Sequence, residues 1–321
     1  MSQKPNVSDR LNAVRRRGLR ASLSDAWKIY VANSKVFSLF LLPYLLLAGL
    51  GAALLSYFLV EVACGYFLPA GYLDLTDSVS GMLVVLSSVK YADWIHLFLS
   101  FLAFGVVFYL LEGAATVQLR FYRAIDSMPR QQKGFSLWSD VRQSAMRLFT
   151  YDVRTFLPWH FICLLVGYFC ARVSFWLVCL PFFLWLAGCL VLYVCRMVLF
   201  AGNGSVLSLR KEIIRNHKFR SECVLALLFS LLPVWFVAVV ALLPVGVLCL
   251  TFIEVARGEL AADIALVPSY VHWLYFPLAT ISFSTMFYAL IIWKWPVALR
   301  IWAADAEAVS MEPADVLSAN S

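Results

Sequence analysis

Six long apolar stretches constrain this chain more than any other feature of its sequence. They cover residues 36–60, 94–118, 156–171, 174–200, 222–252 and 271–293. A helix needs about 20 apolar residues, each rising about 1.5 Å, to cross ~30 Å of hydrocarbon. Backbone groups inside a bilayer have no water to bond, so a crossing segment of this kind is expected to be helical. We therefore predict an all-α integral membrane protein with six transmembrane helices.

The composition supports the same class. Hydrophobic residues make up 62% of the chain and charged residues 14%, whereas a soluble domain has about 45–50% apolar and about 25% charged residues. The net charge of +7 lies in segments that flank the apolar stretches, where it orients the chain and meets anionic headgroups at the cytoplasmic face. It does not indicate a nucleic-acid partner.

The number of basic residues is high and low by turns in successive connecting segments. Eight precede the first apolar stretch, seven follow the second and five follow the fourth, whereas residues 61–93 and 253–270 hold one each. The positive-inside rule then places both termini in the cytoplasm and arranges the spans as three hairpins. Within residues 61–93, the apolar segment 81–87 is too short to cross, so it would lie at the outer interface or enter it as a re-entrant segment.

Each odd-numbered span follows a basic, amphipathic segment, so one unit is used three times. These units begin at Ser22, Ser136 and Ser205. We expect each amphipathic segment to be a helix lying on the cytoplasmic face. Residues 1–35 would form a basic N-terminal segment ending in such a helix, with Trp27 and Tyr30 at headgroup level. Residues 36–302 would form the six-span domain, and residues 303–321 a disordered acidic cytoplasmic tail.

Glu112 and Arg196 are the candidate binding residues, because an ionisable side chain at membrane depth is costly. Glu112 precedes the small residues 113–115 in the second stretch, and Arg196 lies in the fourth. Both are placed towards the cytoplasmic side. They would line a polar cavity that accepts an anionic headgroup or a proton, or they would only join two helices or reach the interface separately.

The end of the sixth stretch predicts interfacial anchors rather than a site. Lys294 stands between Trp293 and Trp295, a pattern typical of an aromatic belt with a lysine that extends to the headgroups. No HExxH, GxSxG, Walker or dinucleotide-binding pattern occurs. The eight cysteines form no CxxC pair and no Cys/His ligand spacing. We therefore predict no catalytic residue, no metal site, no cofactor and no disulfide framework.

The stretch SLSDAWKIYVANSKVFSLFLLPYLLL, from Ser22, resembles the start of bacterial membrane proteins related to the membrane domain of some glycerophosphoryl diester phosphodiesterases. The resemblance covers residues 22–60 well and the later spans loosely. It implies a bacterial inner-membrane protein of about six spans. The soluble phosphodiesterase domain has no counterpart here, so neither its activity nor any site residue is carried over.

The sequence favours a non-enzymatic membrane protein that is transport-like or binds lipid or a partner. Two alternatives stay open. One is an assembly factor or scaffold whose contact surface is the 127–155 linker. The other is an integral-membrane enzyme that modifies lipid. A protein partner or a second copy of the chain is compatible with each of these readings.

Overall fold

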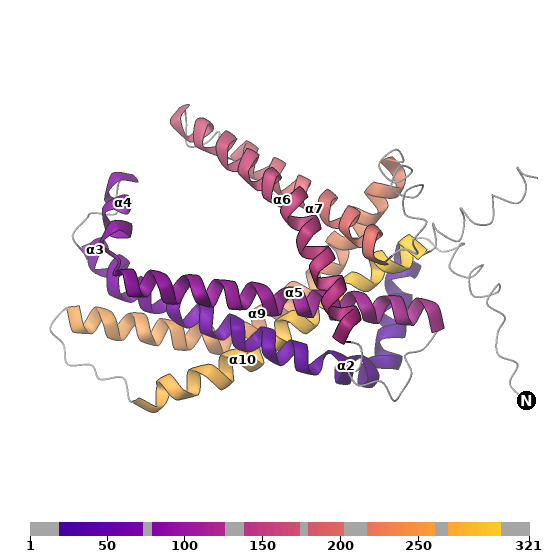
Figure 1. The fold of residues 1–321 in the computed structure, drawn as a ribbon, viewed down its shortest axis with the longest axis horizontal. Coiled ribbons are helices and arrows are strands. Elements are labelled where there is room, and N and C mark those ends of the chain that lie inside the picture. The colour runs from indigo at the N-terminus through magenta and orange to yellow at the C-terminus, as the bar shows by residue number, and fades with distance from the viewer. Residues whose placement is uncertain are drawn as a thin grey trace, which may run out of the picture. The chain divides into compact units, whose positions relative to one another are not determined.

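The computed structural model describes residues 19–72, 79–125, 138–173, 179–201, 217–260 and 269–302. These residues contain helices and no strand (Figure 1). The helices are α2 (Leu19–Val62), the π-helix η1 (Ala63–Phe67), α3 (Leu68–Tyr72), α4 (Val79–Ser88), α5 (Tyr91–Ile125), α6 (Trp138–Val173), α7 (Cys179–Ala201), α9 (His217–Leu260) and α10 (Ser269–Ile292).

Five helical segments among the described residues are long and apolar enough to cross a membrane. They are Ser34–Gly71, Tyr91–Leu119, Trp138–Cys170, Ser221–Gly258 and Trp273–Trp302. A shorter apolar segment, Pro181–Met197, lies in α7. The prediction of an all-helical fold is therefore confirmed for the described part of the chain, and five of its helical segments are candidate membrane spans.

Several helices extend beyond the apolar stretches that the sequence defines. The helix that holds the first apolar stretch continues beyond residue 60 through η1 and α3 to Tyr72, and residues 171–173, between the third and fourth stretches, belong to α6. The amphipathic segments before the first and third predicted spans are continuous with α2 and α6 rather than separate helices. Hydropathy changes along these segments, but no Pro or Gly stands at the change in α2, and α6 continues through Pro158, which lies at the change in that helix.

The remaining boundary predictions divide into two groups. The apolar segment 81–87 belongs to the short helix α4. The tail 303–321 and most of the segment that begins at Ser205 lie outside the described residues.

The chain divides into two units that are described separately. Unit 1 comprises residues 1–40, 112–233 and 291–321, and unit 2 comprises residues 41–111 and 234–290. In unit 1, α6 packs against α7, where the indole of Trp159 covers Gly188 and donates a hydrogen bond of 3.3 Å to the Trp185 carbonyl oxygen. Alanine in place of Gly188 would collide with that indole.

Unit 2 is built on a close approach of α2 to α10. The hydroxyl of Ser284 donates a 2.9 Å hydrogen bond to the Leu45 carbonyl oxygen. A Cβ atom at Gly49 would lie 2.2 Å from the Ser284 hydroxyl and 2.5 Å from the Thr280 carbonyl oxygen. Small residues allow helices to approach this closely in membranes. Further along, the buried Tyr275 shares a 2.7 Å hydrogen bond with Ser56.

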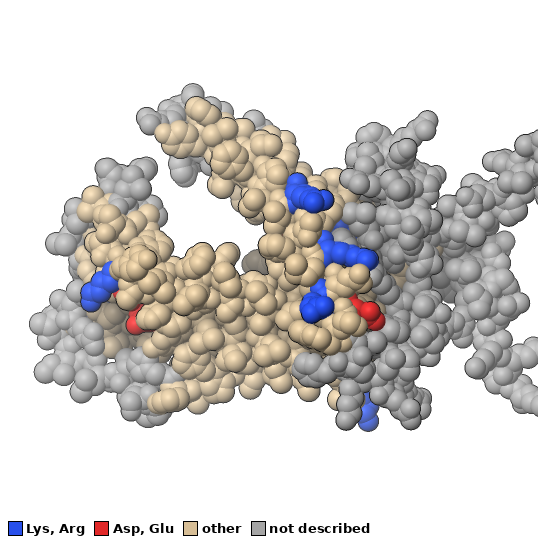
Figure 2. Space-filling view, in the orientation of Figure 1, with Lys and Arg blue, Asp and Glu red and all other residues tan. Residues whose placement is uncertain are grey.

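The outer surface of the described helices is strongly apolar. Leu164 is 73% exposed and Trp235 is 66% exposed. Figure 2 shows that most of the described surface on the visible face carries no Lys, Arg, Asp or Glu. Side chains of this kind are suited to contact with lipid.

The Gly49 contact provides a test of the packing in unit 2. Gly49→Ala should lower stability by about 1–3 kcal/mol, because the added methyl group meets the backbone of α10. Gly105→Ala is the matched control, since nothing lies within 4 Å of its Cβ position. Unfolding temperatures in detergent would be compared, and equal values for the two variants would contradict this packing.

Candidate functional site

Glu112 lies on α5 where the helix is buried on all sides. Every residue from 111 to 119 is buried. The next residue, Gly113, brings α5 close to α6, because a Cβ atom there would lie 2.6 Å from the Val141 carbonyl oxygen. Helices that approach so closely exclude water and lipid from between their backbones. The carboxylate of Glu112 is therefore obliged to find partners within the protein.

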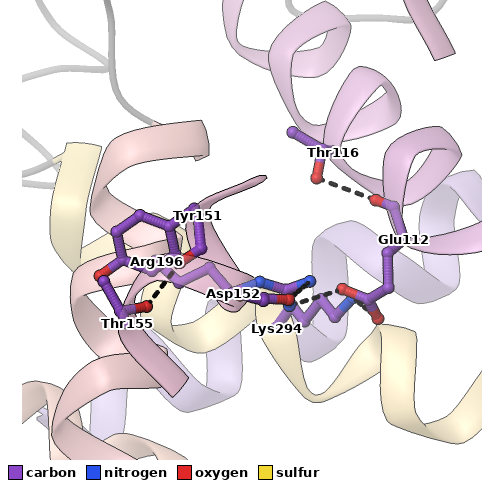
Figure 3. Close-up of polar contacts among 7 residues, drawn as sticks. All are labelled: Glu112, Thr116, Tyr151, Asp152, Thr155, Arg196 and Lys294. Atoms are coloured by element: carbon purple, nitrogen blue, oxygen red, sulfur yellow. Dashed lines mark hydrogen bonds and ion pairs between the residues drawn. The ribbon is translucent and has the colours of Figure 1, made fainter. Parts of the chain in front are cut away.

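Arg196 is one of those partners, and it joins Glu112 to a second carboxylate. Its Nη1 donates to Glu112 Oε2 at 2.9 Å, and its Nη2 lies 3.0 Å from Asp152 Oδ2 of α6. Figure 3 shows the guanidinium between the two carboxylates. The structure thus pairs Glu112 with Arg196, the partner that the sequence suggested.

Lys294 contacts the same carboxylate. Its ammonium nitrogen donates to Glu112 Oε1. Glu112, Arg196 and Lys294 are only 8%, 6% and 4% exposed. We call the set Glu112, Asp152, Arg196 and Lys294 the polar centre. The hydroxyls of Thr116 and Thr155 bond backbone carbonyls of their own helices and take no part in the ion pairs (Figure 3).

A break in the helix immediately precedes Lys294. Helix α10 ends at Ile292, Trp293 adopts a turn, and residues 294–302 are helical again. Pro296 explains this interruption, because it has no N–H to bond the Ile292 carbonyl and its ring collides with that carbonyl in a regular helix. Lys294 is therefore on the first turn after the break.

Aromatic rings surround the guanidinium and the break. The Tyr193 ring centroid lies 5.9 Å from Arg196 Cζ, within the range of a cation–π contact. The same ring stacks on Trp293 with centroids 5.6 Å apart. The Trp293 indole donates a 2.6 Å hydrogen bond to the Leu227 carbonyl oxygen of α9. Residues from α5, α6, α7, α9 and the segment after α10 thus meet around the polar centre.

The prediction that Lys294 and its neighbours are interfacial anchors is wrong for Lys294 and Trp295. Lys294 bonds a buried carboxylate, and Trp295 is 1% exposed and stacks on Phe37 at 4.9 Å. A carboxylate within reach holds the ammonium more strongly than the distant headgroups do. Trp27 is 61% exposed, so its place at the interface stays a prediction. The side chain of Tyr30 lies outside the described residues.

Formal charges within the polar centre cancel, with two carboxylates against two cations. Cancellation matters because an ion transferred from water to a protein interior without a partner costs several kcal/mol. In the described part of the chain, no group of three or more His, Cys, Asp or Glu residues could hold a metal ion.

Two buried polar groups in unit 1 have hydrogen-bonding capacity to spare. Arg196 Nε has no partner, and neither amide atom of Gln118 has one among the described residues. Gln118 is fully buried and lies six residues beyond Glu112 on α5, about 9 Å along the axis. Buried polar groups are nearly always hydrogen-bonded, so these atoms are available to a further partner.

Sequence reasoning missed Asp152 and Gln118 and misassigned Lys294. Asp152 lies in a segment rich in basic residues that suggested a solvated surface helix. The amide of Gln118 carries no charge and gave no signal. The spacing of Lys294 before Pro296 could have suggested a helix break beside a cation.

Coupling between Glu112 and Lys294 can be measured with a double-mutant cycle. Glu112→Gln and Lys294→Met should each cost about 3–5 kcal/mol, because each leaves an uncompensated buried charge. The double variant keeps the neutral Asp152–Arg196 pair. Its loss of stability should therefore be about 1–3 kcal/mol smaller than the sum of the losses in the two single variants. Unfolding would be followed in mixed micelles of detergent and denaturant.

The control cycle uses Glu254→Gln and Arg257→Met, an ion pair of 2.8 Å whose side chains are 64% and 50% exposed. Exposed pairs contribute little to stability, so its coupling should be near zero. Additive losses at Glu112 and Lys294 would show that these two groups do not interact in the folded protein.

Comparison with protein-family models, with curated protein sequences and with solved structures found no match to this chain. The resemblance of residues 22–60 to the phosphodiesterase-associated membrane domain therefore stays a prediction.

Proposed function

We propose that this chain is a six-span membrane protein that binds the anionic headgroup of a lipid at the polar centre, as a lipid-binding or transport-like component of a bacterial inner membrane. The observation that carries the proposal is the surplus of buried N–H donors. A guanidinium and an ammonium carry more N–H donors than the ion pairs of the polar centre use. Arg196 Nε has no partner, and Lys294 bonds Glu112 alone among the described residues.

An anionic oxygen matches this surplus. Phosphate and carboxylate oxygens accept hydrogen bonds only, and they bond guanidinium groups in two-pronged geometry. Burial strengthens such bonds, because the interior screens charge less than water does. Water is the alternative occupant, but a neutral oxygen bonds a buried cation less strongly than an anionic oxygen does.

Charge balance adds a condition to binding. The polar centre is formally neutral without a ligand, so an anion alone would leave it negative. A proton taken up by Glu112 would restore neutrality and would release Arg196 and Lys294 towards the anion. Anion binding is therefore coupled to proton uptake in this proposal, as expected of a transport-like site.

Anionic lipid should rescue the Glu112→Gln variant. Glutamine imitates the protonated acid and leaves the centre with one excess positive charge, so this variant is destabilised in neutral detergent and regains stability when an anion binds. Its unfolding temperature would be measured with phosphatidylglycerol and with phosphatidylcholine. We expect a rise of several degrees with phosphatidylglycerol only.

The matched control is Glu112→Gln combined with Arg196→Gln, which removes the excess charge and the main donor. This double variant should show no selective response to phosphatidylglycerol. An equal response to both lipids, or none, would identify the polar centre as a purely structural set of ion pairs.

A second candidate function is a scaffold or assembly factor that uses the start of α6. Apolar side chains are exposed on a segment whose basic residues predict the cytoplasmic side: Met146 is 60% exposed and Phe149 is 46% exposed. Recovery of one partner in stoichiometric amount, lost in Met146→Ser/Phe149→Ser, would favour this function over lipid binding.

We further propose six spans, with α7 crossing the membrane as the fourth and both termini cytoplasmic. Its support is the apolar segment Pro181–Met197 and the alternation of basic connecting segments.

The topology is tested with fusions of a fluorescent protein that matures only in the cytoplasm. Fusions after residues 130, 210 and 321 should fluoresce, and a fusion after residue 265 should not. If α7 did not cross, the fusions at 210 and 321 would lie on the opposite side and stay dark, while that at 265 would fluoresce.

A further inference from the structure

Unit 2 contains a second polar site, unrelated to the polar centre. A pocket of about 410 Å³ lies around the π-helix η1. The residues that line it include Phe58, Glu61, Tyr66, Lys90 and Asp93. We call it the η1 pocket. Its volume is within the range of small-molecule sites, about 300–1,000 Å³.

Hydrogen bonds fix one wall of the η1 pocket. The Tyr66 hydroxyl donates to Asp93 Oδ2 at 2.6 Å and accepts from the backbone N–H of Lys90 at 3.1 Å. The backbone N–H of Asp93 donates in turn to the Lys90 carbonyl oxygen at 3.0 Å, at the start of α5. Tyr66 lies within η1, and π-helical turns are frequent at functional sites.

Two opposite charges in the pocket remain without partners. Neither the carboxylate of Glu61 nor the ammonium of Lys90 makes an ion pair or a hydrogen bond in the described part of the chain. Both residues line the same cavity, yet their side chains do not pair with each other. Exposed groups so arranged are available to a ligand.

We propose that the η1 pocket binds a zwitterion that carries a primary ammonium and a phosphate diester, as in an ethanolamine phospholipid headgroup or its free soluble counterpart. The ligand's ammonium donates to Glu61 and lies against the aromatic wall, which attracts cations. Its phosphate accepts from Lys90. The apolar span of α5 begins at Tyr91, so the pocket lies at the level of the headgroups.

The test uses the whole chain in nanodiscs and separates the two sources of the ligand. One arm titrates soluble glycerophosphoethanolamine onto protein in pure phosphatidylglycerol nanodiscs. The other counts phosphatidylethanolamine molecules retained from mixed nanodiscs by native mass spectrometry. Saturable binding in the first arm would show that a soluble ligand, or a headgroup alone, is sufficient. Binding that occurs in the second arm and not in the first would show that an intact lipid is required. Either result supports the proposal.

Variants assign the binding to the pocket. Glu61→Gln and Lys90→Met should each weaken binding about tenfold, the loss expected for one charge-assisted hydrogen bond. The exchange Glu61→Lys/Lys90→Glu keeps one charge of each sign and should recover part of the affinity. Glu254→Gln, an exposed acid elsewhere in unit 2, is the matched control and should have no effect.

Glycerophosphoglycerol, which has the phosphate but no ammonium, should not bind. Equal binding of that compound, unchanged affinity in Glu61→Gln and Lys90→Met, or no binding in either arm would each overturn the proposal. Glu61 and Lys90 are exposed, so their variants are expected to fold, and an unchanged unfolding temperature would verify this.

Discussion

A charge at membrane depth requires a partner, and unit 1 is organised by that requirement. The Glu112 carboxylate lies on the stretch of α5, residues 111–119, that is buried on all sides, so the chain supplies Arg196 and Lys294 to it and Asp152 to Arg196. Each of the four comes from a different helical segment. Loss of any one of the four side chains leaves a buried charge unbalanced, so the four groups stabilise the fold as one network rather than as independent ion pairs.

Both proposed sites lie where a helix departs from regular geometry. The polar centre takes Lys294 from the first turn after a break caused by Pro296, and the η1 pocket is built on a π-helix. A regular membrane helix satisfies its own backbone and presents side chains at fixed intervals. Departures from it redirect side chains and free polar groups, so they are places where a ligand can be held.

The sequence was sufficient for the class of fold, since apolar length and composition alone predict membrane-spanning helices. It also singled out Glu112 and Arg196, because both interrupt apolar stretches towards the cytoplasmic side, and it left open whether they pair. Helix ends were less predictable. Hydropathy marks where a chain enters lipid, whereas a helix ends only where the backbone is interrupted, and α2 and α6 run through their predicted boundaries.

Lys294 shows why the rest of the site could not be predicted. A lysine between two tryptophans at the end of an apolar stretch is typical of an interface, and only the position of Glu112 in space changes that interpretation. The ion pair of Asp152 could not be predicted for the same reason, because the residues near it in the sequence are basic. Pairing across a bundle depends on how helices cross, and hydropathy carries no information on crossing.

Retention of anionic lipid as a function of pH tests the central claim most directly. Native mass spectrometry would count the phosphatidylglycerol molecules bound to wild-type protein and to Glu112→Gln, released from the same membranes at several pH values. The account predicts that retention by the wild type increases as the pH falls, since Glu112 must accept a proton, and that retention by the variant does not depend on pH. The same pH dependence in both proteins would contradict it.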